Sequence, residues 1–161
     1  MALLEKITQD DLLIYEILRN PVLCGEFIYN YDLVEGIDEP FEFSWYQKEI
    51  LCDFNSKVSI VTARATGKTV SLTSLIFWAL VFKAFPGDYI LYTVPSKVHL
   101  EPVFTNLIRY LRSNTFLKHF IEKNSGINSS DYKISLMNGA TLFCRIAGQS
   151  GTGANVIGLH T

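Results

Sequence analysis

The chain has 161 residues, of which 48% are hydrophobic and 19% are charged, so a packed globular body is expected and a disordered chain is excluded. This length suits one domain with a real core and little more. The net charge of −2 and a sequence pI of about 5.9 give no support to a broadly basic nucleic-acid-binding surface.

The cysteines and the apolar runs indicate which cellular compartment the chain occupies. Cys24, Cys52 and Cys144 are widely spaced and show no C-x-x-C pair. We therefore expect neither a zinc site nor a disulfide framework, but three small buried hydrophobes in a reducing compartment. The start of the chain lacks the apolar core of a secretory signal. The longest apolar run, 75–82, is far short of the ~20 residues that a membrane span needs, so we expect a soluble protein without a membrane partner.

The first 55 residues are predicted to be mostly helical. Helices are expected over 10–19, 21–31 and 44–54, with a loop over 35–40. Ser44 can cap the third helix, because Gln47 follows three residues later as in a capping box. We expect 1–40 to form an N-terminal helical segment that precedes a separate domain.

The most informative stretch runs from Lys57 to Thr69. An apolar, β-branched run predicts a strand, a short loop ends in Gly67-Lys68-Thr69, and an apolar helix is expected over 70–85, buried between layers. The order strand, loop, helix is typical of a triphosphate pocket. Thr62 stands where the pattern G-x-x-x-x-G-K-[ST] has its first Gly. The alternative is a Gly-Lys turn that caps an ordinary helix.

Each residue type in this loop has a chemical reason. Lys68 carries a compact ammonium for the terminal phosphates, and the hydroxyl of Thr69 can ligate Mg²⁺. Gly67 lets the backbone approach the phosphates closely. Arg64 is either a second phosphate cation that stabilises transition-state charge or a solvated loop residue. The predicted nucleotide-binding residues are Thr62, Ala63, Arg64, Ala65, Thr66, Gly67, Lys68 and Thr69, with Lys68 and Arg64 as the catalytic pair.

An aromatic pair and a carboxamide precede the loop as Trp45-Tyr46-Gln47. An aromatic ring can stack on adenine, and Gln47 offers a donor and an acceptor to the edge of the base. The three residues are predicted to bind the base, with ordinary helix packing as the alternative.

The second half of the chain alternates between strands and helices. We expect a strand over 88–94, helices over 96–112 and 115–123, a polar loop over 124–131, and strands over 132–137 and 140–146. Asn138-Gly139 between the last two strands predicts a hairpin. The fold class is therefore α/β, a three-layer domain with a mostly parallel sheet.

A working P-loop ATPase also needs an Asp at the end of an apolar strand to hold the Mg²⁺ shell, commonly followed by Glu. Downstream of Thr69 no apolar strand is followed by Asp-Glu. We therefore expect the chain to be the N-terminal part of a longer protein, with little ATPase activity by itself.

Together these features resemble the large terminase subunit of tailed bacteriophages, the ATPase that drives DNA into empty capsids. Trp45-Tyr46-Gln47 resembles the adenine motif of that family, and the loop 63–69 resembles its deviant Walker A loop, with Arg in second place. Thr93-Val94-Pro95-Ser96 with the helix after it is similar to the segment that follows the second strand. The hairpin with its Gly-rich tail resembles the region before Walker B. The resemblance spans roughly 41–161.

The resemblance implies an additional-strand P-loop NTPase fold over 41–161, partial because the Walker B strand and the nuclease domain are absent. It implies ATP and Mg²⁺ as cofactors, and double-stranded DNA, the portal protein and the small terminase subunit as partners. It also implies a homo-oligomeric ring in the full-length protein, at the procapsid portal in the host cell cytoplasm.

The family often carries an arginine just before Walker B that acts on a neighbouring subunit. Gly153-Ala154-Asn155 occupies that place here, which leaves Arg145 as the candidate arginine finger. The alternative for Arg145 is an exposed strand residue.

Two other functions remain open at this stage. A helicase-like DNA translocase shares the Gln motif and the Walker A loop. A non-catalytic nucleotide-binding assembly module would use ATP only to order the domain.

Overall fold

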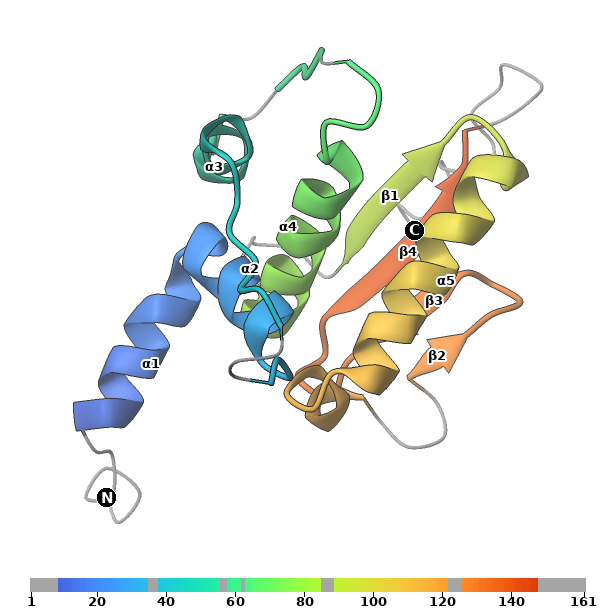
Figure 1. Ribbon diagram of the computed structural model, residues 1–161. Coiled ribbons are helices and arrows are strands. Elements are labelled where there is room, and N and C mark those ends of the chain that lie inside the picture. Colours follow the sequence, from blue (N-terminus) through green and yellow to red (C-terminus); the bar gives the residue numbers. More distant parts are fainter. Residues whose placement is uncertain are drawn as a thin grey trace. The chain divides into compact units, whose positions relative to one another are not determined.

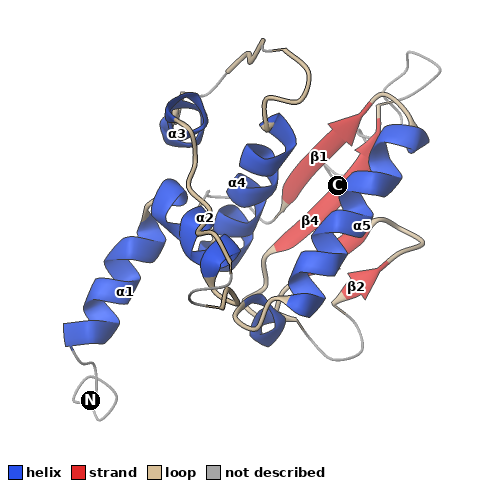
Figure 2. Cartoon of the chain, viewed as in Figure 1, coloured by secondary structure: helices blue, strands red, loops and turns tan. Residues whose placement is uncertain are grey.

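The structure is a computed structural model that describes residues 9–34, 38–55, 58–61, 63–84, 89–121 and 126–147. The chain divides into two compact units, Met1–Trp78 and Ala79–Thr161. Figure 1 labels their helices and strands, and Figure 2 distinguishes helix, strand and loop. The predicted division at 40/41 stays a prediction.

Helices dominate the first unit. They are α1 (Gln9–Arg19), α2 (Pro21–Asn30), α3 (Trp45–Cys52) and α4 (Lys68–Phe82), the last of which continues into the second unit. The helices expected from sequence are therefore present, with α4 beginning at Lys68. Asn20 caps α2 because its Oδ1 accepts from the N–H groups of Val22 (2.9 Å) and Leu23 (3.3 Å), while Pro21 occupies the first helical position.

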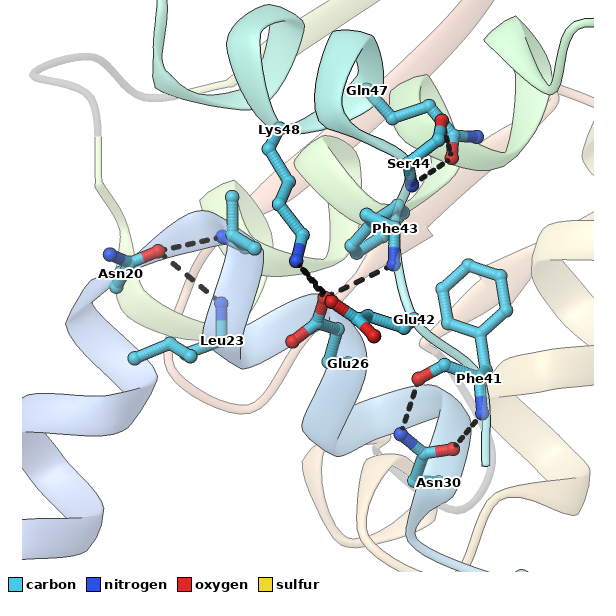
Figure 3. A network of polar contacts seen from close by, with 11 residues as sticks. Asn20, Leu23, Glu26, Asn30, Phe41, Glu42, Phe43, Ser44, Gln47 and Lys48 are labelled. Atoms are coloured by element: carbon cyan, nitrogen blue, oxygen red, sulfur yellow. Dashed lines mark hydrogen bonds and ion pairs between the residues drawn. The ribbon is translucent and has the colours of Figure 1, made fainter. Parts of the chain in front are cut away.

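The segment before α3 is held against α2 by side chains (Figure 3). Asn30 binds both backbone groups of Phe41, since its Nδ2 donates to the carbonyl (2.8 Å) and its Oδ1 accepts from the N–H (2.7 Å). Glu26 accepts from the N–H of Phe43 at 3.1 Å. Lys48 of α3 pairs with Glu26 (3.5 Å) and Glu42 (2.6 Å). These contacts fix the start of α3 relative to α2.

The hydrogen bond from Lys48 lowers the pKa of Glu42, and the same bond raises the pKa of Lys48. The Glu42–Lys48 pair therefore stabilises the fold above the ordinary pKa of a carboxyl group. This stabilisation is lost as the pH falls through the lowered pKa of Glu42 in the folded chain.

A close approach between α2, α4 and Phe43 forms the core of this unit. Val22, Phe43 and Leu51 are buried together there. A Cβ on Gly25 would lie 2.1 Å from Ser74 Oγ and 2.7 Å from the Phe43 ring, so only glycine fits at this crossing. The Ser74 hydroxyl is buried and has no hydrogen-bond partner among the described residues.

The expected strand before the loop is absent from the described residues 58–61, so that prediction was wrong for them. Val61 is 93% exposed and Val58 is also exposed. A β-branched run forms a strand only when a neighbouring strand pairs with it, and no ladder partner for 58–61 is present in the part of the chain that the structure describes.

The second unit contains a four-stranded mixed sheet of order β1-β4-β3-β2. Its strands are β1 (Ile90–Val94), β2 (Ile127–Asn128), β3 (Lys133–Ser135) and β4 (Thr141–Ile146). β1 and β4 are parallel, whereas the β4–β3 and β3–β2 pairs are antiparallel. The short β2 lies where the sequence indicated only a polar loop.

The hairpin of β3 and β4 forms around Asn138-Gly139, as the alternating pattern predicted. Gly139 has φ +83°, a conformation that suits glycine in a tight turn. Asn138 Nδ2 donates to the carbonyls of Leu80 and Val81, both at 2.8 Å, which ties the turn to the end of α4.

Helix α5 (Lys97–Ser113) packs against β1 and β4 (Figure 1). Its apolar face and the inward side of the hairpin form the core of the second unit, with Leu100, Phe104, Leu107, Leu111, Ile134, Leu136, Leu142 and Cys144 buried. The 3₁₀-helix η2 (Leu117–Phe120) follows where a short helix was expected. None of the helices in the described ranges combines the length and the apolar character needed to cross a bilayer.

Two of the three cysteines are buried as expected, namely Cys24 and Cys144. Cys52 is exposed, so the prediction of a buried residue was wrong there. It is the last residue of α3 and directly follows the buried Leu51, so its side chain leaves the helix on a different side from that apolar contact.

Candidate nucleotide-binding site

The loop before α4 has an unusual backbone. Ala65 (φ +61°) and Gly67 (φ +79°) are both in the left-handed region, whereas Thr66 between them is not. Left-handed residues that alternate with ordinary ones turn successive N–H groups towards one side and form an anion-binding concavity. The loop leads directly into a helix of 15 residues, whose first N–H groups have no intrahelical partner.

Three carbonyls of this loop accept hydrogen bonds from the protein. The carbonyl of Ala63 accepts from Lys68 Nζ (2.7 Å) and from the Thr66 hydroxyl (3.1 Å). The carbonyl of Thr66 accepts from the Tyr46 hydroxyl at 2.8 Å. The carbonyl of Gly67 accepts from the N–H of Ser71 at 3.1 Å and from Gln47 Nε2 at 3.4 Å.

The predicted phosphate ligand Lys68 and the predicted Mg²⁺ ligand Thr69 occupy the first turn of α4. Lys68 is half-buried and its ammonium is folded onto the loop at Ala63, from where it must swing out to reach an anion. Thr69 is exposed, with its side chain accessible for Mg²⁺. Arg64 is exposed.

Helix α3 brings two of its three predicted base-binding residues to the same loop. Trp45 is 72% exposed, and its ring lies edge-on to that of Tyr46 with centroids 5.7 Å apart. Tyr46 and Gln47 contact the carbonyls of Thr66 and Gly67. The structure therefore joins two motifs that are separated by about twenty residues of sequence.

Gln47 is 8% exposed and both ends of its carboxamide have partners. Its Oε1 accepts from the N–H (2.9 Å) and the hydroxyl (2.8 Å) of Ser44, in the capping box that the sequence indicated (Figure 3). Its Nε2 donates to Gly67 over a long 3.4 Å. Recognition of adenine by Gln47 would require these contacts to be exchanged, whereas Trp45 already presents an open ring.

Arg145 belongs to the second unit, on β4. Its guanidinium donates to the carbonyls of Asp131 and Cys144 and lies 5.0 Å from the centroid of the Phe143 ring. These contacts hold the side chain along the strand. Its role as an arginine finger stays a prediction.

Some predicted residues lie outside the described ones. Thr62, at the position of the first Gly of the pattern, is one of them, and Gly153-Ala154-Asn155 is another such segment. Within the described residues no group of three His, Cys, Asp or Glu side chains is placed to hold a metal ion. A cation at this site would depend on Thr69 and on the phosphates themselves.

Sequence reasoning missed the hydroxyl of Tyr46 as a partner of the loop, and it missed the left-handed Ala65. A tyrosine in an aromatic pair carries no signal for a main-chain carbonyl twenty residues away. Comparison with protein-family models, with curated proteins and with solved structures found no match to the chain. Its function therefore has to be inferred from the residues and their geometry.

Proposed function

We propose that this chain is the ATP-binding part of a viral DNA-packaging motor, a terminase large subunit that couples ATP hydrolysis to translocation of double-stranded DNA into a procapsid. The observation that carries the proposal is the loop 63–69. It has left-handed residues at Ala65 and Gly67, and it leads into a helix that begins with Lys68 and Thr69. This combination supplies amides, an ammonium and a hydroxyl to one polyphosphate.

A second feature supports ATP as the nucleotide. The α3 residues Tyr46 and Gln47 contact the loop, and the exposed Trp45 ring belongs to the same helical turn. A base stacked on Trp45 would thus belong to a nucleotide whose phosphates reach the amides of the loop. In the proposal, Mg²⁺ is held by the Thr69 hydroxyl and the phosphate oxygens, and Arg64 neutralises the developing charge.

The partners are proposed from the resemblance alone. The full-length protein would form a homo-oligomeric ring at the portal in the host cell cytoplasm, with the small terminase subunit, the portal protein and duplex DNA as its partners. The chain itself is acidic overall, with a net charge of −2, so its DNA contacts would be local or would arise in the assembly.

Nucleotide binding is tested by titrating a fluorescent ATP analogue into the wild-type chain and the Lys68→Ala variant. We expect saturable binding by wild type and at least roughly a hundredfold loss in Lys68→Ala, because the variant leaves phosphate charge without its ammonium partner. Lys97→Ala on α5 is the control, since that exposed lysine lies outside the loop and pairs with Glu101. Equal affinity of all three proteins would contradict the proposal.

The loop and α3 also fit a helicase-like DNA translocase or a nucleotide-ordered assembly module. Turnover of the full-length protein separates these possibilities. A packaging motor is stimulated by procapsids that carry the portal, a helicase is stimulated by DNA alone, and an assembly module has no turnover.

A further inference from the structure

We infer that Tyr46 is a positioning residue for the phosphate-binding amides, rather than part of the surface that stacks on the base. This inference rests on the proposed function of the loop. It starts from the Tyr46 hydroxyl, which donates to the carbonyl of Thr66 at 2.8 Å.

The geometry of the peptide unit links this bond to the anion site. In a trans peptide the C=O of one residue and the N–H of the next point in opposite directions within one plane. All described peptide bonds are trans. A Thr66 carbonyl that faces Tyr46 therefore directs the N–H of Gly67 away from α3.

The neighbouring peptides are fixed as well. The carbonyl of Gly67 accepts from the N–H of Ser71 at 3.1 Å, the first hydrogen bond of α4, and more weakly from Gln47 Nε2 at 3.4 Å, so the N–H of Lys68 points out of the start of the helix. The carbonyl of Ala63 is held by Lys68 and by the Thr66 hydroxyl. Tyr46 of α3 thus sets the direction of the Gly67 amide, whereas the first hydrogen bond of α4 sets that of the Lys68 amide.

This orientation needs an external donor because the loop has little rigidity of its own. Gly67 has access to many backbone conformations, and Ala65 occupies a region that costs an L-residue roughly 1–2 kcal/mol. Among the described carbonyls of the loop, that of Thr66 is the one that α3 holds with a short bond. The Tyr46 hydroxyl keeps the Thr66–Gly67 peptide from flipping its carbonyl towards the phosphates, where it would repel them.

The direct test is calorimetric titration of the 161-residue chain with inorganic tripolyphosphate and with ATP, for wild type and for Tyr46→Phe. Removal of one hydroxyl is expected to raise the Kd for both ligands by the same factor, roughly threefold to tenfold. The preference for ATP over GTP should not change. Tyr15→Phe on α1 is the matched control, because it removes an exposed hydroxyl in the same unit.

Trp45→Ala should affect only one of the two ligands. It should weaken ATP binding and leave tripolyphosphate binding unchanged, because only the base would lose its partner. If Tyr46→Phe shows that pattern, or shows no change for either ligand, the positioning role is refuted while the nucleotide site stands. If wild type binds neither ligand, the proposed function fails and the inference fails with it.

Amide shifts of the wild-type chain test the orientation before any variant is compared. In ¹H–¹⁵N spectra, tripolyphosphate should shift the amides of Gly67 and Lys68 more than that of Ser71, whose N–H already donates within the helix. Tyr46→Phe should reduce the shift of Gly67 most. Larger shifts at Ser71 than at Gly67 would show that the amides face another way.

Discussion

Two loop residues adopt the left-handed backbone conformation, and only one of them is glycine. Gly67 was predicted from sequence as the residue that lets the backbone approach phosphate, and its φ of +79° gives a second reason for glycine there. Ala65 gave no such signal, because an alanine is compatible with every secondary structure. The backbone need at Gly67 was thus predictable because the residue type is specific, whereas the phosphate and Mg²⁺ roles of Lys68 and Thr69 stay predictions.

Gly67→Ala should destabilise the first unit by roughly 1–3 kcal/mol, from strain at positive φ and a clash with Gln47. The added Cβ would lie 2.4 Å from Gln47 Nε2. Ala65→Gly is the matched change, and it should be neutral or slightly stabilising because it relieves the same strain. Urea unfolding curves measure both effects. Equal stability of Gly67→Ala and wild type would show that the loop has a different backbone.

The cysteines differ in reactivity because they differ in burial. Burial raises the pKa of Cys24 and of Cys144 to about 12, whereas Cys52 is exposed. At pH 8 the native chain should therefore react with one equivalent of a thiol reagent, and Cys52→Ser should abolish this reaction. Three equivalents should react after unfolding. Rapid native reaction at Cys144 would contradict the packing of β4.

These raised pKa values also make the free energy of unfolding depend on pH. Both thiols are neutral when folded, and the unfolded thiols ionise near their ordinary pKa of 9.0. The stabilisation that the two buried neutral thiols contribute is complete below pH 9.0 and is lost as the pH rises towards 12. Thermal unfolding of the Cys24→Ala, Cys144→Ala double variant should thus depend less on pH between 9 and 11 than that of wild type.

At the scale of elements, the helices and the hairpin followed from periodicity and turn chemistry. Asn138-Gly139 and the alternation in β4 specified the hairpin, and the apolar spacing in α5 specified its buried face. The run 58–61 was predicted as a strand and is not one, because composition reports strand preference but does not supply a partner. A strand that depends on distant residues cannot be located from its own sequence.

The connection between α2 and the segment before α3 gives a prediction at this scale. Asn30→Ala removes both hydrogen bonds to the backbone of Phe41 and should cost about 1–3 kcal/mol of unfolding free energy. It should also weaken nucleotide binding modestly, because α3 carries Tyr46 and Gln47. Asn55→Ala is the control, since the bonds of Asn55 within the described residues are local ones to Asp53. A stable Asn30→Ala variant would show that this segment is held mainly by the packing of the Phe41 ring on Tyr29, whose centroids lie 4.8 Å apart.

At the scale of the whole molecule, the sequence contains the predicted phosphate loop but no apolar strand that ends in Asp-Glu. The chain should therefore bind ATP but hydrolyse it at a negligible rate. A phosphate-release assay at saturating Mg·ATP measures this rate. Robust turnover that disappears in Lys68→Ala would contradict this and would require a carboxylate that we have not identified.

The charge balance gives a second expectation for the molecule. With a net charge of −2, the chain should show little affinity for duplex DNA at physiological salt, because non-specific binding depends on the release of counterions by basic side chains. Fluorescence anisotropy with labelled duplex measures this. Tight binding that weakens steeply with salt would reveal a basic patch that the composition conceals.

The central claim is that amides of the loop 63–69 bind a polyphosphate while Lys68 neutralises it. A crystal structure of the chain with a non-hydrolysable ATP analogue and Mg²⁺ tests it most directly. We predict phosphate oxygens within hydrogen-bond distance of the Gly67 and Lys68 amides, with the ammonium moved from Ala63 to the phosphates. A nucleotide bound elsewhere, or a loop that side chains fill so that no anion can enter, would contradict it.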